Sequence, residues 1–243
     1  MISVCVATYN GQYYLAEQLA SILQSPLVDE VVISDDGSSD GTRALIARCE
    51  DPRVRLVEGP RAGVVRNFES LLSQAKGDQI FLADQDDVWR PEKVETMVDA
   101  LRTSDLALSD CTVVDQRLNV LHISFFALRS SRPGLARNLI RNGYVGCCIA
   151  FNRSLLTYAL PFPKSLPMHD WWLGLVAESF GTVCFVPAPL VLYRRHGENV
   201  SDTSGRSRAT PWRRLAWRAT LVAHLAIRWL SLRFYRSSSH VRP

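Results

Sequence analysis

Residues 29–50, DEVVISDDGSSDGTRALIARCE, decide the fold class. The run DEVVISDD is rich in β-branched residues and predicts a strand, and the run DGTRALIARCE predicts a helix. The glycines of DDGSSDGT, between the two, permit a tight turn whose backbone amides face a ligand before the helix begins. A strand, a glycine-rich turn and a helix form the repeating unit of an α/β protein.

The same unit recurs on either side of this stretch. Strands are predicted at residues 2–9, 54–59 and 79–83, and helices at residues 13–23, 67–75 and 90–101. Strands that alternate with helices in this way are joined by right-handed crossovers and form a parallel sheet. Ligands of such sheets bind just outside the carboxyl ends of the strands.

Polar side chains follow three of the predicted strands, at the ends where a ligand would bind. Thr8 and Asn10 follow the first strand, Asp35 ends the second, and an acidic cluster in LADQDDVW, residues 82–89, follows the fourth. Each cluster therefore occupies the ligand-binding edge of the predicted sheet.

The acidic cluster places three carboxylates within four residues. Residues two apart in a strand share a face about 6 to 7 Å from each other, so Asp84 and Asp86 can converge on one cation. Mg²⁺ suits so short a cluster, because it takes one or two carboxylates and completes its shell with water and phosphate oxygens. The alternative is a solvated acidic turn in which Asp86 or Asp87 caps the next helix.

Several other kinds of site are excluded by the sequence. The spacing of acids around residues 36–41 imitates a calcium loop, but the closing acidic position is Ala47. Neither GxxxxGK nor GxGxxG occurs, so P-loop and dinucleotide-binding chemistry have no support. The six cysteines are scattered without a CxxC pair, which indicates buried thiols rather than a zinc site or a disulfide framework. The first residues enter a strand pattern at once, so we expect no secretory signal and a cytosolic protein.

The second half of the chain is less regular. Strands are predicted at residues 106–115 and 142–156 with a return helix, followed by a proline-bounded loop at 161–167. A helix is predicted over 168–181, with His169 or Asp170 at its N-cap. Residues 183–201 predict two short strands broken by prolines, which lead into a basic cluster of Arg194, Arg195 and His196.

Charge is divided unevenly along the chain, whose net charge is +4. Residues 205–243 hold nine arginines and no acid, so the other 204 residues carry 19 basic and 24 acidic groups. Basic tails of this kind usually meet anionic surfaces.

The tail predicts an amphipathic helix from Trp212 onward. One side of the helix carries Trp212, Leu215, Ala216, Ala219, Val222, Ala223, Ala226 and Leu230, and the other carries Arg213, Arg214, Arg218, Arg228 and Arg236. His224 and Arg228 interrupt the apolar run, so the helix does not span a bilayer. We expect it to lie in the interface of an anionic membrane, and the alternative is a helix packed on the catalytic body or on a second subunit.

Five motifs in the order VCVATYNG, ISDDGSSDGT, FLADQDDVW, HDWWLGL and LYRRHGENVS resemble those of family 2 glycosyltransferases of the GT-A fold. The residues within these motifs are similar to those of the bacterial rhamnosyltransferase-like branch. The resemblance spans residues 1 to about 200. It implies a Rossmann-like, mostly parallel sheet flanked by helices in a domain of residues 1–204. Residues 1–103 would form its nucleotide-sugar-binding half and 104–204 its acceptor-binding half, with 205–243 as a basic amphipathic tail.

The resemblance also implies an activity. The enzyme would transfer a sugar from a dTDP- or UDP-linked donor to a hydroxyl of a glycan or lipid-linked glycan, with inversion at the anomeric carbon. The similarity to the rhamnosyltransferase-like branch suggests rhamnose as the sugar. Mg²⁺ or Mn²⁺ would be the cofactor. The setting would be bacterial cell-surface polysaccharide synthesis, in the cytoplasm at the inner face of the cell membrane.

Metal and donor residues follow from the same resemblance. Asp84 and Asp86 fall on the two positions of the family's DxD motif, whose second aspartate binds the metal that bridges the donor diphosphate. His196 sits where some relatives supply a further metal or diphosphate ligand, and a hydrogen-bonded surface histidine is its alternative. Positions that line the nucleotide pocket in the family carry over to Thr8, Asn10, Asp35 and Arg66, with Asp84 as a further donor contact.

Four assignments that the resemblance implies have plainer alternatives. Arg66 is either a ligand of the base and diphosphate or an ion-pair partner of Glu69. Asp170 maps to the family's catalytic base, and a helix N-cap is its alternative. Trp171 and Trp172 are acceptor-side candidates that exclude water or stack on a sugar, although tryptophans in such a helix more often belong to the core.

Two further classes of function stay open. A catalytically silent nucleotide-sugar or glycan-binding module would keep the fold, but binding alone does not need a free acid on the acceptor side, where Asp170 stands. A nucleic-acid binder would use the arginine tail, yet the acidic body speaks against it, and we expect no nucleic acid as a partner.

Overall fold

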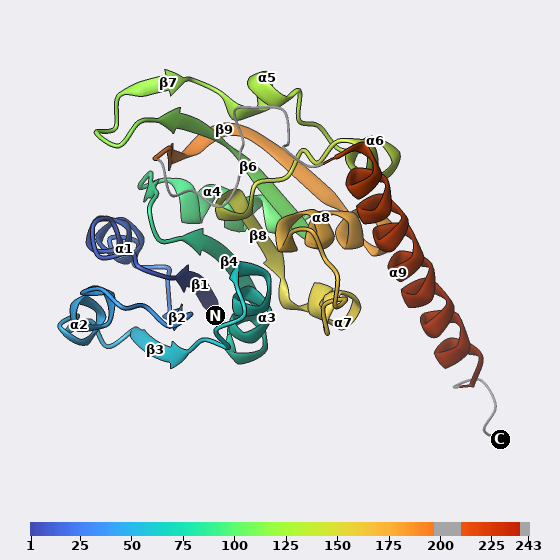
Figure 1. Ribbon diagram of the computed structural model, residues 1–243, viewed down its shortest axis with the longest axis horizontal. Helices are drawn as coiled ribbons and strands as arrows, with labels where there is room; N and C mark the ends of the chain where they lie inside the picture. Colours follow the sequence, from blue (N-terminus) through green and yellow to red (C-terminus); the bar gives the residue numbers. More distant parts are fainter. Residues whose placement is uncertain (197–209, 239–243) are drawn as a thin grey trace.

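The computed structural model describes residues 1–196 and 210–238 (Figure 1). The end of the fifth motif, residues 197–201, and the arginines at 206, 208 and 242 lie outside the described residues. The strands are β1 (Ile2–Thr8), β2 (Glu30–Asp35), β3 (Val54–Glu58), β4 (Gln79–Asp84), β5 (Val88–Trp89), β6 (Leu106–Val114), β7 (Val120–His122), β8 (Ile149–Asn152) and β9 (Val183–Arg194). The helices are α1 (Leu15–Leu23), α2 (Thr42–Ala47), α3 (Val64–Gln74), α4 (Lys93–Leu101), α5 (Phe125–Arg129), α6 (Leu135–Ile140), α7 (Leu156–Ala159), α8 (His169–Phe180) and α9 (Pro211–Ser238).

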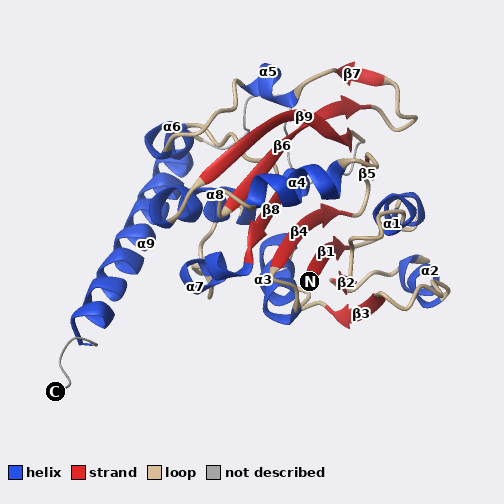
Figure 2. Ribbon diagram, turned by 180° about the vertical axis from the view of Figure 1, so that it is seen from behind, coloured by secondary structure: helices blue, strands red, loops and turns tan. Residues whose placement is uncertain are grey.

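One curled sheet runs through the molecule in the order β3-β2-β1-β4-β8-β6-β9-β5, and β7 pairs with β6 (Figure 2). The four strands β3, β2, β1 and β4 are parallel, as the alternating pattern predicts. β8 is antiparallel to β4 and β6, and β6 is parallel to β9. The predicted α/β fold with a mostly parallel sheet, flanking helices and a C-terminal helix is confirmed.

The core holds this sheet by burying apolar side chains on both of its faces. Phe68, Leu71 and Leu72 of α3 are fully buried, and α3 lies against β1 and β2. Each such side chain stabilises the fold by about 1.5 to 3 kcal/mol. Because β1, β2 and β4 are parallel neighbours, their carboxyl ends, and the polar residues that follow them, meet at one edge.

Several predicted boundaries are wrong. The helix predicted at 67–75 begins at Val64, directly after Gly63 with its φ of 84°, and the helix predicted at 40–50 covers only α2. The strand predicted at 142–156 is reduced to β8, with 3₁₀ turns at Gly146–Cys148 and Arg153–Leu155 on either side. The loop predicted at 161–167 is confirmed between α7 and α8.

The prediction of two short strands in 183–201 is also wrong, because β9 runs without a break through both prolines. Its pairing with β6 shifts register on either side of Asp110, so Pro187 and Ala188 fall at an irregularity of the ladder. A bulge of this kind accommodates a proline, which has no N–H group to give to a ladder.

No side-chain caps of the predicted kind are formed. Met168 occupies the N-cap of α8, so His169 and Asp170 lie in its first turn. Glu92 occupies the N-cap of α4, and neither Asp86 nor Asp87 caps that helix.

The tail forms a single long helix, α9, that lies along α6 and α8 (Figures 1 and 2). Leu221 is fully buried, and Trp217 and Leu225 pack against the core. Arg218 and Arg228 donate hydrogen bonds to the carbonyl oxygens of Ile140 and Pro161. No helix in the described part of the chain combines the length and apolarity that a membrane crossing requires.

Candidate active site

The acidic loop, residues 84–87, is fastened to the end of β1 by the side chain of Gln85. Thr8 Oγ1 and the backbone N–H of Tyr9 donate to Gln85 Oε1 at 2.6 and 2.9 Å, and Gln85 Nε2 donates to the Tyr9 carbonyl at 3.0 Å. A Cβ at Gly11 would lie only 2.4 Å from Gln85 Oε1, so a larger residue there would displace the Gln85 side chain. Sequence reasoning missed Gln85, which lies between the two aspartates of the DxD motif.

Asp84 ends β4 and lies among other acids. Desolvation, and then the charges of Asp86 and Asp170, raise the pKa of Asp84 to about 8. Asp170 comes from the first turn of α8, so the fold brings together carboxylates that are more than 80 residues apart in the chain. A carboxyl pKa raised this far marks a place where a bound positive charge would be stabilised.

Asp86 is held by the chain that follows β9. Its Oδ2 lies 2.6 Å from His196 Nε2, and the His196 ring stacks on Tyr14 with ring centroids 5.0 Å apart. Arg194 Nε donates to the Asp86 carbonyl oxygen at 2.7 Å, and the Arg194 side chain also forms an ion pair with Glu17. The structure therefore brings His196 to the acidic loop, and its role as a metal or diphosphate ligand stays a prediction.

A second group of possible ligands lies deeper in the same place. Oxygens of Asp84 and Asp87 and the Cys147 sulfur lie within 4.8 Å of one another. Asp87 Oδ1 accepts a hydrogen bond from the Arg194 N–H at 2.9 Å, whereas its buried Oδ2 has no hydrogen-bond partner among the described residues. Desolvation and the neighbouring charges of Asp86 and Asp84 raise the pKa of Asp87 well above its usual value. The scattered spacing of the cysteines gave no sign that Cys147 would join this group.

Lys93 is a second functional candidate that sequence reasoning missed. Its side chain is fully buried, donates to the Cys147 carbonyl at 3.0 Å and lies 4.6 Å from the centre of the Trp89 ring. Desolvation lowers its pKa. The sequence could have indicated this burial, because Lys93 precedes Met97 and Leu101 by four and eight residues and so lies on the same buried face of the helix.

The predicted donor residues line the edge formed by β1 and β2. Asn10 adopts a left-handed conformation with φ of 51°, and its Oδ1 accepts the Ser39 N–H at 2.9 Å. The carboxylate of Asp35 is fully buried, accepts the Ser38 N–H at 3.1 Å and pairs with Arg43 at 3.2 Å. Asp35 therefore holds the glycine turn in shape, and its contact with a nucleotide base stays a prediction.

Asp36 and Asp40 shape the turns that precede two helices. Asp36 accepts the Gly63 N–H at 2.8 Å ahead of α3, and Asp40 accepts the Thr42 N–H at 3.0 Å ahead of α2. Both carboxylates thus favour the start of a helix.

Arg66 forms the ion pair that was its alternative role. Its guanidinium pairs with Glu69 and donates to the carbonyl oxygens of Phe162 and Pro163 at 3.3 and 2.8 Å. Arg66 therefore ties α3 to the loop before α8, and its role as a donor ligand stays a prediction.

The first turn of α8 holds Asp170, the predicted base, and its neighbour His169. Desolvation raises the pKa of Asp170 to about 6 although hydrogen bonds from Trp171 N–H and the Asn142 side chain act in the opposite direction. His169 is fully enclosed, stacks on Phe68 with ring centroids 3.9 Å apart, and has a pKa that burial lowers to about 3.

The two tryptophans differ in what they can reach. Trp172 is fully buried and donates to the Ala159 carbonyl at 2.9 Å, so it belongs to the core and cannot stack on a sugar. Trp171 is 7% exposed and donates to the Asn138 carbonyl at 2.7 Å, and its contact with an acceptor stays a prediction.

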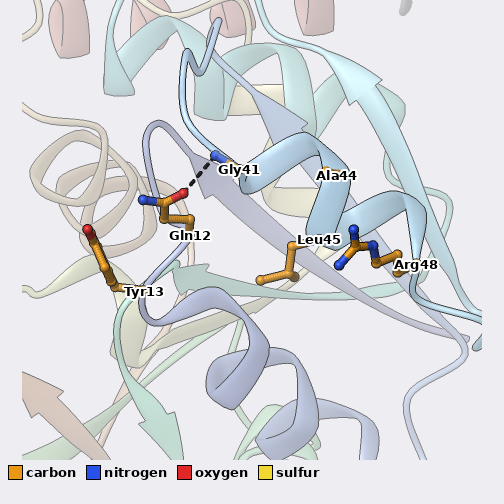
Figure 3. A pocket seen from close by; sticks show the side chains of 6 residues that line it. All are labelled: Gln12, Tyr13, Gly41, Ala44, Leu45 and Arg48. Carbon is orange, nitrogen blue, oxygen red and sulfur yellow. Dashed lines mark hydrogen bonds between the residues drawn. The ribbon is translucent and has the colours of Figure 1, made fainter.

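A pocket of about 450 Å³ opens beside the β1 loop, away from the acids. It is lined by Gln12, Tyr13, Gly41, Ala44, Leu45 and Arg48 (Figure 3). The Gly41 N–H donates to Gln12 Oε1 at 2.8 Å across its wall. None of its lining residues is acidic, so we place the candidate site at the acidic loop instead.

Comparison with known proteins agrees with this geometry. The family model described as glycosyl transferase family 2 matches residues 3–159. An uncharacterised protein of Mycobacterium tuberculosis is 31% identical over 217 residues, which cover 81% of this chain and 67% of that protein. The Escherichia coli enzyme UDP-Glc:alpha-D-GlcNAc-diphosphoundecaprenol beta-1,3-glucosyltransferase WfgD is 23% identical over 70% of this chain and 68% of its own. The dTDP-rhamnosyl transferase RfbG of Shigella flexneri is 24% identical over 80% of this chain and 72% of its own.

Solved glycosyltransferase structures share the fold. Staphylococcus aureus TarS 1–349 in complex with UDP-GlcNAc has a TM-score of 0.69 at 18% identity, covering 92% of this chain and 66% of that one. The mannosyltransferase PcManGT of Pyrobaculum calidifontis, in complex with GDP-Man and Mn²⁺, has a TM-score of 0.60 at 21% identity, covering 95% and 63%.

The chain spans about two thirds of the length of several of the curated relatives it matches. The family match covers well over half of this chain and includes the glycine turn and the acidic loop. The chain therefore belongs to glycosyl transferase family 2.

Proposed function

We propose that this chain is an inverting, metal-dependent glycosyltransferase that acts on a nucleoside-diphosphate sugar. The observation that carries the proposal is the meeting of Asp170, from α8, with the acidic loop after β4. Such a site offers one carboxylate cluster for a cation and one carboxylate on the acceptor side. Displacement at a sugar carbon needs both, because a diphosphate leaves as an acceptor hydroxyl attacks.

Asp170 is proposed as the general base. Its pKa of about 6 leaves most of it ionised at neutral pH and makes it a stronger base than an ordinary aspartate. An attacking hydroxyl would give its proton to Asp170, while the nearly buried Trp171 would keep water away from the donor.

The residues of the acidic loop fit a divalent cation. Nearby positive charge would lower the raised pKa values of Asp84 and Asp87. It would also give a partner to the buried Asp87 Oδ2, which has none among the described residues. We propose Asp84, Asp86 and His196 as its ligands. These three residues would hold a cation, which would supply positive charge to offset that of a leaving diphosphate.

The buried group of Asp84, Asp87 and Cys147 is the alternative ligand set. Asp87 and Cys147 are fully buried, whereas the Asp86 side chain keeps 11% of its surface exposed. A hard ion that must also hold phosphate oxygens needs an accessible position, and thiols suit softer metals. Both points favour Asp86 and His196.

Binding of Mn²⁺ by purified protein, followed by electron paramagnetic resonance, separates the two sets. We expect His196→Ala to weaken binding at least about tenfold and Cys147→Ala to leave it unchanged. The reverse result would move the cation to the buried group.

The donor would lie along the edge lined by Thr8, Asn10 and Asp35, with Arg66 and Asp84 near its diphosphate. TarS and PcManGT were solved with UDP-GlcNAc and GDP-Man, which supports a nucleotide sugar here. RfbG is named for a dTDP-rhamnosyl donor, so dTDP- or UDP-rhamnose is our first choice for the donor.

The acceptor proposed is a glycan or lipid-linked glycan in bacterial surface-polysaccharide synthesis. WfgD is named for an acceptor sugar on diphosphoundecaprenol, which is a membrane lipid. We propose residues 1–103 as the donor half, 104–204 as the acceptor half and 205–243 as the part that contacts the inner face of the cell membrane.

The experiment that tests the activity is a panel of nucleotide sugars incubated with purified protein, with and without Mn²⁺ or Mg²⁺. Release of nucleoside diphosphate is the readout. We expect release to require metal, and Asp86→Ala and Asp170→Asn each to lower it about 10² to 10⁴-fold. Asp99→Asn, an exposed change on α4, is the matched control and should keep full activity.

Full activity in the presence of a chelator or in Asp86→Ala would contradict the metal assignment, and full activity in Asp170→Asn would contradict the base. Saturable binding of a nucleotide sugar without any turnover across the panel would identify a silent binding module instead.

A further inference from the structure

The outward side of α9 is apolar from Trp212 to Leu230. Trp212 is 80% exposed, and Leu215, Val222, Ile227, Trp229 and Leu230 are exposed as well. The opposite side of the helix, with Leu221, Arg218 and Arg228, faces the body. The helix is amphipathic as the sequence predicts, but its apolar side points away from the protein.

A second segment carries the same combination of residues. Residues 116–142 contain five arginines and no acid, as the tail does. Their exposed large hydrophobic residues are Val120, Leu121, Ile123, Leu128, Leu135 and Ile140. A shallow pocket of about 530 Å³ lies among the residues of β7 and α5.

The fold places these two segments together. α6 contacts α9, and Arg218 of α9 donates to the Ile140 carbonyl. Figure 1 shows β7, α5 and α6 following one another along one edge of the molecule, up to the start of α9. In the described part of the chain, twelve of the sixteen exposed large hydrophobic side chains belong to these two segments. We call their exposed side chains together the basic apolar face.

We infer that the basic apolar face docks the protein on an anionic lipid bilayer. A water-exposed apolar surface of this extent marks a contact site, and the charge of the face decides what it contacts. Arg132, Arg137, Arg141 and Arg213 are exposed around it, and no acid lies in either segment. Lipid phosphates attract such a surface, whereas a second copy of this chain would bring arginine against arginine. Tryptophans such as Trp212 and Trp229 favour the boundary between water and lipid.

The face is also joined to the acceptor side of the site. Asn138 of α6 accepts the Trp171 indole N–H at 2.7 Å, and Asn142, just beyond α6, hydrogen-bonds Asp170. Docking through α6 would therefore hold Asp170 beside the membrane, where the head of a lipid-linked acceptor emerges. This last step rests on the proposed function.

Vesicle flotation with the full chain tests the face. Wild-type protein should float with vesicles of phosphatidylcholine and phosphatidylglycerol, and much less with pure phosphatidylcholine. Arg137→Glu with Arg141→Glu, both on or next to α6, should lower the partition coefficient about tenfold or more, because each basic residue near the surface contributes about fivefold. Ile140→Ser should also lower it.

The controls carry the same changes outside the face. Arg48→Glu with Arg102→Glu reverses two exposed arginines elsewhere, and Leu27→Ser removes an exposed leucine. Both should float like wild type, and all variants should keep the wild-type thermal midpoint. If the α6 variants float like wild type, residues 116–142 do not contact the bilayer. Membrane contact would then be limited to the tail. A dimer in sedimentation that Ile140→Ser dissociates, without any change in flotation, would assign the face to a second copy.

Flotation is independent of turnover, so the two proposals can fail separately. Asp86→Ala protein should float like wild type. If the protein floats but releases no nucleoside diphosphate from any donor, the proposed activity is refuted and membrane docking stands. If it releases nucleoside diphosphate but does not float, membrane docking is refuted and the activity stands.

Discussion

Asp170 shows how burial alone changes the chemistry of a residue. An aspartate in the first turn of an exposed helix would titrate near 4, but Asp170 is enclosed and its pKa rises to about 6. The sequence assigns the position through the HDWW motif, while the basicity comes from the packing around α8.

The pH dependence of turnover follows from that pKa. A general base works only when it is ionised, so at saturating donor kcat should fall about tenfold per pH unit below about pH 6 and level off above it. The measurement is nucleoside diphosphate release between pH 4.5 and 8. A rate that stays constant down to pH 5 would contradict the role of Asp170.

His169 should make the fold sensitive to acid. Its pKa is about 3 in the folded protein and about 6.5 in an unfolded chain. Between these values only the unfolded state binds the proton, so this histidine lowers the free energy of unfolding as pH falls through that window. From pH 7 to pH 5 the loss is about 2 kcal/mol.

Urea unfolding of wild type and His169→Leu at pH 7, 6 and 5 measures this contribution. The variant should be the less pH-sensitive of the two, with the difference growing toward pH 5. Parallel curves for the two proteins would show that His169 is protonated in the folded state.

At the scale of elements, the end of β9 holds the acidic loop in place. The Arg194 N–H binds Asp87, its side chain binds the Asp86 carbonyl and the Gln116 carbonyl, and it pairs with Glu17. The sequence placed a basic cluster at 194–196, but it could not show that the end of β9, which pairs with β6 and β5, would bring that cluster to residues 84–87. The prediction of two strands failed for the same reason, because ladder pairing with β6 carries β9 past its prolines.

We expect Arg194→Met to weaken both the fold and the cation site. Its loss leaves two carbonyl oxygens and a half-buried glutamate without their partner, which costs about 2 to 3 kcal/mol of the free energy of unfolding. Mn²⁺ affinity should fall with it, because Asp86 loses its support. Arg90→Met, an exposed change on the other side of the loop, should alter neither quantity. Unchanged Mn²⁺ affinity in Arg194→Met would show that Arg194 does not support the cation site.

At the scale of the whole molecule, α9 is attached to the body through one side only. Leu221 is the α9 residue that is fully buried in the described part of the helix, with Trp217 and Leu225 beside it. The attachment is small for a helix of 28 residues, which leaves the outward side available for a second contact.

Leu221→Ala should loosen α9 without unfolding the domain. A buried leucine shortened to alanine costs about 2 to 5 kcal/mol, so amide hydrogen exchange in α9 should speed up about 30-fold or more, while β1 and β4 keep their protection. Val222→Ala, the neighbouring exposed position, is the matched control and should change little. Equal exchange rates in the two variants would show that Leu221 does not anchor the helix.

The sequence by itself determined the α/β alternation, the acids at the strand ends and the two-sided character of the tail. These features depend on neighbours within a few residues, where strand and helix periodicity fix which side chains share a face. The strand that ends at Asp35 and the position of Asp84 at the end of β4 were predicted correctly on that basis.

Only the tertiary structure decided the rest of the site and the orientation of the tail. It brought Asp170 and His196 to the acidic loop, enclosed Lys93 and Cys147 beneath it, and joined Arg66 to the carbonyl oxygens of Phe162 and Pro163. It also turned the arginine side of α9 inward and joined α9 to α6. The physical reason is that contacts between residues far apart in the chain depend on how whole elements pack, and a periodic pattern says which face is apolar without saying what will cover it.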